Sequence, residues 1–106
     1  SDEADPKYAE YSLQTSRIAD LYWSVNQTRL YPQATAEQGV LAVGLESVTP
    51  NLSHFLVQQD GGAWLEHRGA LQWQLHVGDN TLAVRGVNVF GKEGRISRAR
   101  VTLTRR

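Results

Sequence analysis

The chain has 106 residues, enough for one hydrophobic core but too few for two, which predicts a single domain. Its 11 basic and 11 acidic residues cancel, so the net charge gives no reason to expect nucleic acid or an anionic membrane as a partner. The absence of cysteine excludes disulfides and thiolate metal sites, and no apolar run approaches the ~20 residues of a membrane span.

The N-terminal segment, SDEADPKYAE, is acidic and polar with Pro6 near its middle. Such a composition buries too little apolar surface to offset the entropy lost on ordering. We therefore interpret residues 1–12 as a linker or flexible N-terminal extension and residues 13–106 as the folded domain. Methionine is absent throughout, position 1 included, which favours a module excised from a longer protein.

Strand-like segments follow from Asp20 onward, where apolar residues recur with a period of two. No helical pattern of about 10–15 residues separates these segments, so antiparallel pairing is expected. Seven strands are predicted, near Leu21–Thr28, Gly39–Glu46, Ser53–Gln59, Ala63–His67, Leu71–Leu75, Thr81–Asn88 and Ser97–Thr104.

Turn residues separate the predicted strands. Pro50 ends the second strand, because proline lacks the donor for a sheet hydrogen bond. Asp60-Gly61-Gly62 predicts a hairpin between the third and fourth strands, and Gly78-Asp79-Asn80 and the segment from Gly91 to Gly94 predict turns flanking the sixth.

Each predicted strand has one apolar face, and seven such strands are best accommodated by two sheets packed face to face. The fold class expected is therefore all-β, an immunoglobulin-like antiparallel β-sandwich of about seven strands. The residues expected between the sheets are Leu41, Val43, Phe55, Val57, Trp73, Leu82, Val84, Val101 and Leu103.

A family resemblance supports the same fold class. It rests on Phe55-Leu56-Val57, on the Asp60–Trp64 and Leu71–Leu75 segments, on the turn and strand from Gly78 to Arg85, and on Asn88-Val89-Phe90-Gly91. Over residues 52–103 the chain resembles fibronectin type III and related immunoglobulin-like domains, in particular those appended to bacterial extracellular proteins. The resemblance implies an extracellular or periplasmic location and no catalytic residue, since such domains serve as spacers, packing partners and binding modules alike.

The tryptophans are candidates for ligand contact, because flat aromatic rings stack on sugars. Trp73 alternates with Leu71 and Leu75, which predicts a core position, and core or sheet-edge packing is also favoured for Trp23. Trp64 follows the Gly-Gly turn, so Trp64 with Arg68 forms the predicted ligand-contact patch, although Trp64 covering the end of the core is the alternative.

No catalytic or metal-binding constellation is predicted. His54, His67 and His76 are too widely spaced, without a paired carboxylate at a fixed offset, to indicate zinc. Asp79 and Asn80 offer two oxygens where calcium prefers about six to eight, and no nucleophile elbow is present. We expect no catalytic residue, no metal and no cofactor, hence no enzyme.

Two functions are consistent with these observations. The first is a non-catalytic accessory module, a spacer or packing unit in a larger exported bacterial protein, whose partners are neighbouring domains of the parent chain. The alternative is a carbohydrate- or protein-binding module that contacts polysaccharide or another protein through Trp64. Neither predicts a nucleic-acid partner or membrane insertion.

Overall fold

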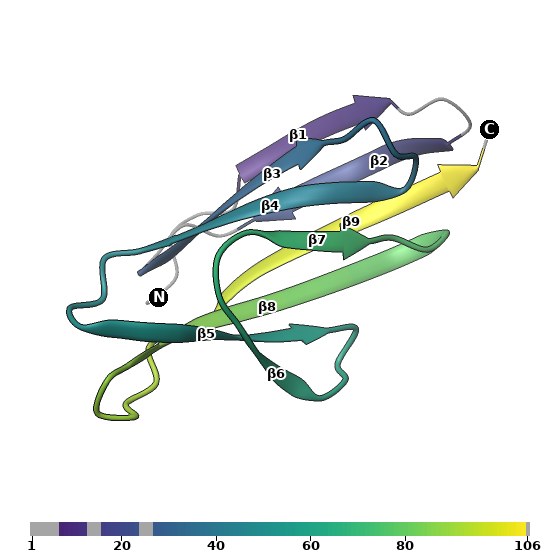
Figure 1. Cartoon of the computed structure of the whole chain (residues 1–106). Helices are drawn as coiled ribbons and strands as arrows, with labels where there is room; N and C mark the ends of the chain where they lie inside the picture. Colours follow the sequence, from purple (N-terminus) through teal and green to yellow (C-terminus); the bar gives the residue numbers. More distant parts are fainter. Residues whose placement is uncertain (1–6, 13–15, 24–26, 106) are drawn as a thin grey trace.

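The structure, a computed structural model, describes residues 7–12, 16–23 and 27–105, with side chains described for 27–104. In these residues the chain forms nine strands and no helix (Figure 1). The larger sheet has the order β1-β2-β9-β8-β5-β6, with β1 at Lys7–Ser12, β2 at Ser16–Trp23, β9 at Ser97–Arg105, β8 at Gly78–Asn88, β5 at Leu52–Gln59 and β6 at Trp64–His67. The smaller sheet has the order β3-β4-β7, with β3 at Thr28–Ala34, β4 at Val40–Ser47 and β7 at Leu71–Gln74.

The predicted all-β, two-sheet antiparallel architecture is confirmed. Strands β3 to β9 form a three-stranded layer facing a four-stranded one, and β1 and β2 extend the larger layer beyond β9 (Figure 1). The chain crosses between the layers after β2, after β4, after β6 and after β7, so neighbouring strands within a sheet are often distant in sequence.

The core lies between the two layers, where every second residue of a strand points inward. In β7, for example, Leu71 and Trp73 are buried while Gln72 and Gln74 are exposed. The predicted core is confirmed in full, since all nine residues expected there are at most 5 % exposed. The cluster also contains Leu30, Leu71 and Ala99.

The strand predicted near Leu21–Thr28 is wrong as a single element. Strand β2 ends at Trp23 and β3 begins at Thr28, and residues 24–26 lie outside the described part of the chain. The sequence pattern missed most of β3 because Pro32 lies inside it, opposite Val43. Proline is tolerated there because β3 is an edge strand, which needs to donate hydrogen bonds on one side only.

The expected linker over residues 1–12 contains a strand in its second half. Lys7 pairs with Trp23 and Ser12 with Arg17, so β1 and β2 form an antiparallel hairpin. Residues 1–6 lie outside the described residues, as do the side chains of β2, including that of Trp23.

The predicted hairpin at Asp60-Gly61-Gly62 is confirmed between β5 and β6. Asp60 and Gly61 have φ angles of 51° and 71°, and the Gly62 amide donates to the Gln59 carbonyl at 2.9 Å. Two consecutive positive φ angles match a type I′ turn, whose twist fits the right-handed twist of the paired strands.

The turn predicted at Gly78-Asp79-Asn80 is wrong, since these residues open β8, with Gly78 opposite Leu103. Asn80 nevertheless stabilises the adjacent connection from inside the strand. Its fully buried side chain accepts from the His76 amide at 2.8 Å and donates to the carbonyls of His76, Gly78 and Val101.

Candidate binding site

The predicted contact residues Trp64 and Arg68 lie at opposite ends of β6. Trp64 opens the strand and pairs with Gln58, on the outer face of the sheet, and is half-buried. Arg68 follows the last residue of β6 and donates to the Ser53 carbonyl at 2.6 Å and to the Glu66 carboxylate at 3.0 Å. Strand β6 alone puts about 10 Å between its ends. The two residues are thus separated along β6, with Glu66 between them, and a shared ligand contact stays a prediction.

The three histidines are dispersed as well. His54 Nε2 lies 3.8 Å from the Glu66 carboxylate, and His67 Nε2 lies 2.9 Å from the Ala70 carbonyl oxygen. His76 Nε2 lies 3.1 Å from the Asp60 carboxylate and Nδ1 lies 3.0 Å from the Val77 carbonyl oxygen. Among the residues the structure describes, no three His, Cys, Asp or Glu side chains converge as a metal site requires.

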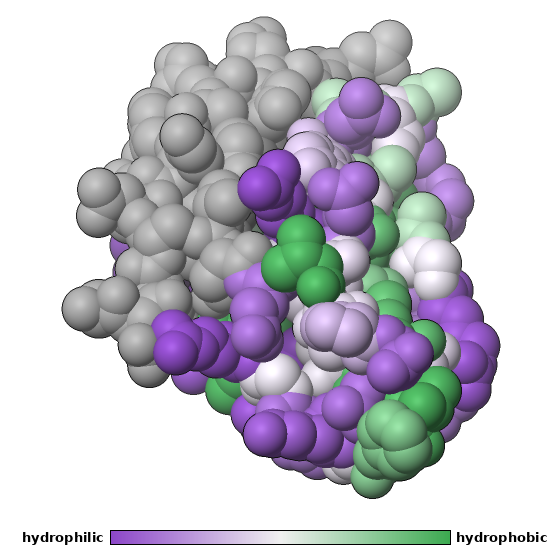
Figure 2. Space-filling view, turned by 90° about the vertical axis from the view of Figure 1, so that its left-hand side faces the viewer, coloured by the Kyte–Doolittle hydropathy of each residue, from purple (hydrophilic) through white to green (hydrophobic). Residues whose placement is uncertain are grey.

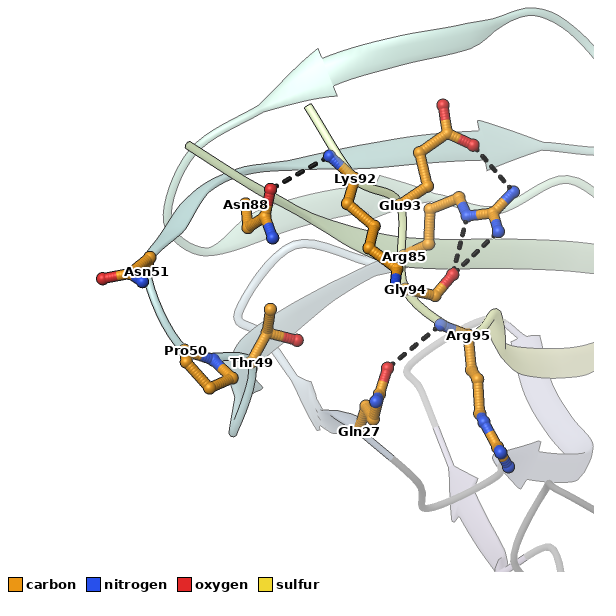
Figure 3. Close-up of a pocket in the computed structure, with 10 residues that line it drawn as sticks. All are labelled: Gln27, Thr49, Pro50, Asn51, Arg85, Asn88, Lys92, Glu93, Gly94 and Arg95. Carbon is orange, nitrogen blue, oxygen red and sulfur yellow. Dashed lines mark hydrogen bonds and ion pairs between the residues drawn. The ribbon is translucent and has the colours of Figure 1, made fainter. Parts of the chain in front are cut away.

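A pocket of about 520 Å³ opens at the end of the sandwich where β4 passes to β5 and β8 to β9 (Figure 3). Its lining comes from three separate segments of the chain. The lining residues are Gln27, Thr49, Pro50, Asn51, Arg85, Asn88, Lys92, Glu93, Gly94 and Arg95.

Arg85 on β8 organises one wall of the pocket. Its Nε and Nη2 donate to the Gly94 carbonyl at 3.0 and 2.7 Å, and its Nη1 lies 3.2 Å from the Glu93 carboxylate (Figure 3). A fork of guanidinium donors on one carbonyl and one carboxylate fixes the loop geometrically as well as electrostatically. The guanidinium group of Arg85 is thus paired with the β8–β9 loop.

Asn88, the last residue of β8, caps the β8–β9 loop. Its Oδ1 accepts from the amides of Phe90 and Lys92 at 2.9 and 3.0 Å, and its backbone pairs with the Lys92 carbonyl and the Gly91 amide. An asparagine side chain that bonds the backbone two residues ahead forms an Asx turn. The loop tip is therefore held by both the side chain and the main chain of one residue.

Gln27 joins the remaining segments. Its side-chain oxygen accepts from the Arg95 amide at 3.1 Å and its carbonyl from the Val48 amide at 3.0 Å. A Cβ atom at Gly94 would lie 2.7 Å from the Gln27 Oε1, so a larger residue there would require the Gln27 side chain to move. The Val89 amide donates to the Asn51 carbonyl at 2.8 Å and ties the two loops together directly.

The carboxylate and the hydroxyl of the described pocket lining are both engaged by neighbouring residues. Its carboxylate, Glu93, is paired with Arg85, and its hydroxyl, Thr49 Oγ1, accepts from Ser47 Oγ at 2.8 Å. General acid–base chemistry needs a titratable group within reach of a reacting atom, commonly with a second group to orient it. The described lining supplies hydrogen-bond donors and positive charge, without such a pair.

Sequence reasoning missed the exposed apolar side chains beside this pocket. Val48 is 65 % exposed, Val89 61 % and Phe90 82 %. Figure 2 shows this end of the molecule, where hydrophobic side chains interrupt a mostly hydrophilic surface. The available signal was the position of Phe90, which lies beyond the last alternating residue of β8 and directly before Gly91.

A second pocket of about 370 Å³ lies beside the β5–β6 hairpin, with Val57, Leu65 and Leu71 among its lining residues. Leu65 is 66 % exposed there, on the core-facing side of the sheet. Leu65 is thus a further exposed apolar side chain, on a different element from Val48, Val89 and Phe90.

Comparison with known proteins adds no identification: no family model matches the chain, and neither a curated protein nor a solved structure is significantly similar to it. Within the described ranges, no helix is long and apolar enough to span a membrane.

Proposed function

We propose that this domain is a non-catalytic, immunoglobulin-like accessory module that spaces or buttresses neighbouring domains of a larger exported bacterial protein. The observation that carries the proposal is the use of the pocket's polar groups. Arg85, Asn88 and Gln27 all direct their side chains at the backbone of the same loop. A site whose polar groups already satisfy one another stabilises a shape and has few groups left for substrate chemistry.

The strand arrangement supports the immunoglobulin-like part of the proposal. Strands β3 to β9 divide into two facing antiparallel sheets, and the chain changes sheet three times between them. Two antiparallel sheets with such crossing connections are typical of immunoglobulin and fibronectin type III sandwiches. The fold class alone does not assign a function.

The test is thermal unfolding of the parent protein with and without the domain. We expect its removal to lower the parent's unfolding temperature, because contacts between domains of one chain bury about 600–1,500 Å². The isolated domain should show no hydrolase, lyase or transferase activity. An unchanged unfolding temperature would contradict the proposal.

The alternative is a carbohydrate- or protein-binding module, favoured by the half-buried position of Trp64 on the outer face of β6. A partly exposed ring on a sheet face can stack on a sugar. Binding of the isolated domain to a polysaccharide panel tests this function. Micromolar affinity that Trp64→Ala abolishes, with no change in the parent's stability, would establish binding and overturn the accessory role.

A further inference from the structure

We propose that the pocket drawn in Figure 3 binds a small sugar acid, a hydroxyl-rich ligand that carries a carboxylate. The inference goes beyond the accessory function and does not depend on it, because binding requires no chemistry from the lining. The site is distinct from the Trp64 face of β6, since Trp64 does not line the pocket. It uses the hydrogen-bond donors that the contacts within the loop leave over.

The side-chain amides of Asn88 and Gln27 each keep an NH2 group for a ligand. Asn88 Oδ1 accepts from the amides of Phe90 and Lys92, and Gln27 Oε1 accepts from the Arg95 amide. A backbone amide can only donate, so these contacts fix which end of each side chain is the oxygen. The other ends, Asn88 Nδ2 and Gln27 Nε2, donate to no group in the described part of the chain. The pocket lining therefore contains two oriented donors.

Positive charge in the lining favours an anion. Lys92 is exposed, its side chain runs from the loop tip towards Gly94 (Figure 3), and within the described residues it forms no ion pair. Arg95 is a further cation of the lining. The carboxylate of the lining, Glu93, lies 3.2 Å from Arg85 Nη1, which offsets its charge. A carboxylate that accepts from neutral donors and a cation together forms stronger hydrogen bonds than a neutral acceptor does.

The size and the lining of the pocket indicate the rest of the ligand. Its volume of about 520 Å³ lies within the range of about 300–1,000 Å³ for small-molecule sites, more than a bare inorganic ion fills. Among the described lining residues, Pro50 alone has a purely hydrocarbon side chain, so an apolar ligand would desolvate the other groups without pairing them. Hydroxyl groups both donate and accept, and can pair with the side chains of Thr49 and Asn51. A hydroxyl-rich ligand therefore fits the lining better than an acyl chain or an aromatic ring.

The walls of the pocket are fixed before any ligand binds. The Val89 amide donates to the Asn51 carbonyl and the Gly94 amide to the Gly86 carbonyl, both at 2.8 Å. These hydrogen bonds add to the fork of Arg85 on the Gly94 carbonyl. A pre-organised site loses little conformational entropy on binding, so contacts with the ligand are not offset by ordering of the loop.

The test is a titration of the isotopically labelled 106-residue chain with galacturonate and with glucuronate, followed by amide chemical shifts. A ligand of this size at ordinary efficiency binds with a Kd of about 1 mM. We expect the shifts to concentrate at residues 49–51 and 88–95. Galactose and glucose, which lack the carboxylate, should bind about tenfold more weakly or worse. Trigalacturonate in parallel distinguishes the end of an acidic polysaccharide, which it would bind more tightly, from a free sugar acid.

Two variants remove the donors and keep the loop. Asn88→Asp and Gln27→Glu retain the oxygen that accepts from the backbone and exchange the NH2 group for a second carboxylate oxygen. Both should fold as the wild type and weaken sugar-acid binding about tenfold or more. Lys92→Gln, at an exposed position, should act in the same direction. The control Arg100→Gln also removes an exposed cation, but opposite Thr81, about 23 Å along β8 from Asn88, and should leave the affinity unchanged.

Four results would overturn the inference. Absence of shifts with both sugar acids at about twenty times the expected Kd excludes the pocket as their site. Shifts at residues 58–66 instead place the ligand on the Trp64 face. Equal affinity for the neutral sugars removes the role of charge, and equal affinity for sodium sulfate reduces the pocket to a site for a bare oxyanion. None of these results bears on the accessory function, which the unfolding comparison with and without the domain decides separately.

Discussion

Asn80 is the residue whose role is most easily misjudged from sequence. Its place in a Gly-Asp-Asn triplet predicts a turn, yet the structure places it in β8, fully buried. The turn chemistry is correct but the location is not, because the side chain reaches back to residues 76–78 while the backbone has already joined the sheet. A local propensity cannot distinguish a residue within a turn from one that stabilises the turn from outside.

Asn80→Ala should lower the free energy of unfolding by about 2–3 kcal/mol, since each buried polar group left without a partner costs about 1–3 kcal/mol. The groups at risk are the His76 amide and the carbonyls that Asn80 now binds. Urea unfolding measures the loss, with Thr81→Ala on the exposed face as control. A loss below about 0.5 kcal/mol, typical of surface positions, would show that water replaces the side chain.

Trp73→Ala should cost about 3–5 kcal/mol, because it removes a large ring that is 1 % exposed at the centre of the core. A domain of this size has only about 5–15 kcal/mol in total, so the variant should be close to unfolded. Trp64→Ala, at a half-buried position on the outer face, is the matched control and should cost clearly less. Equal losses in denaturant titrations would mean that Trp64 is as much a core residue as Trp73.

His76 links two turns at the scale of elements, between the β5–β6 turn and the β7–β8 connection. The backbone hydrogen bond to Val77, then the hydrogen bond and charge of Asp60, raise the pKa of His76 above its ordinary value of 6.5. Both ring nitrogens face oxygens, an arrangement that only the doubly protonated ring satisfies fully with donors.

Because the pKa of His76 is raised in the folded state, protonated His76 stabilises the fold. This stabilisation is fully present below the unfolded-state pKa, near 6.5, and is lost as the pH rises through the higher folded-state pKa. His76→Gln should therefore lower the melting temperature more at about pH 5.5 than at about pH 8. The effect should be small, because the ion pair is solvent-exposed. If His76→Gln lowers the melting temperature equally at both pH values, or shows the same pH dependence as the control His67→Gln, the stabilising role of protonated His76 is contradicted.

The β1–β2 hairpin is an addition to the seven-stranded sandwich. The core residues identified among the described side chains lie on β3 to β9, and β2 contributes backbone pairing along β9. Deleting residues 1–23 should leave a cooperatively unfolding domain with β9 as an open edge, and open edges promote association. Ultracentrifugation and thermal unfolding of the shortened chain test both points, and loss of cooperative unfolding would make the hairpin part of the core.

The strands were predicted best where the alternation of apolar and polar residues agrees with the position of turn-forming residues. From Val40 onward each predicted strand matches an observed one within about three residues at its ends, and the Asp60-Gly61 turn has the geometry its residues favour. Prediction failed before residue 40, where Pro32 inside β3 obscured the strand pattern. It also failed for β1, because its sequence, KYAEYS, does not alternate regularly between apolar and polar residues.

At the scale of the whole molecule, the two-layer architecture and its core followed from periodicity alone, since each apolar face has to be covered. The candidate site did not, because the pocket joins residues as far apart as Gln27 and Arg95. Such proximity depends on the order of strands in the sheets. Periodicity says which face of a strand is buried, but not which strand becomes its neighbour.

The position of β9 has a consequence for the way the chain is made. The last strand lies in the interior of the larger sheet, between β2 near the start of the chain and β8. Synthesis proceeds from the N-terminus at about 5–20 residues per second. Strand β9, with which β2 pairs, is therefore synthesised several seconds after β2. The β1–β2 hairpin, which emerges before β3 to β9, is therefore among the last elements to reach its final place. A nascent chain that stops before Ser97 lacks the strand that pairs with both β2 and β8.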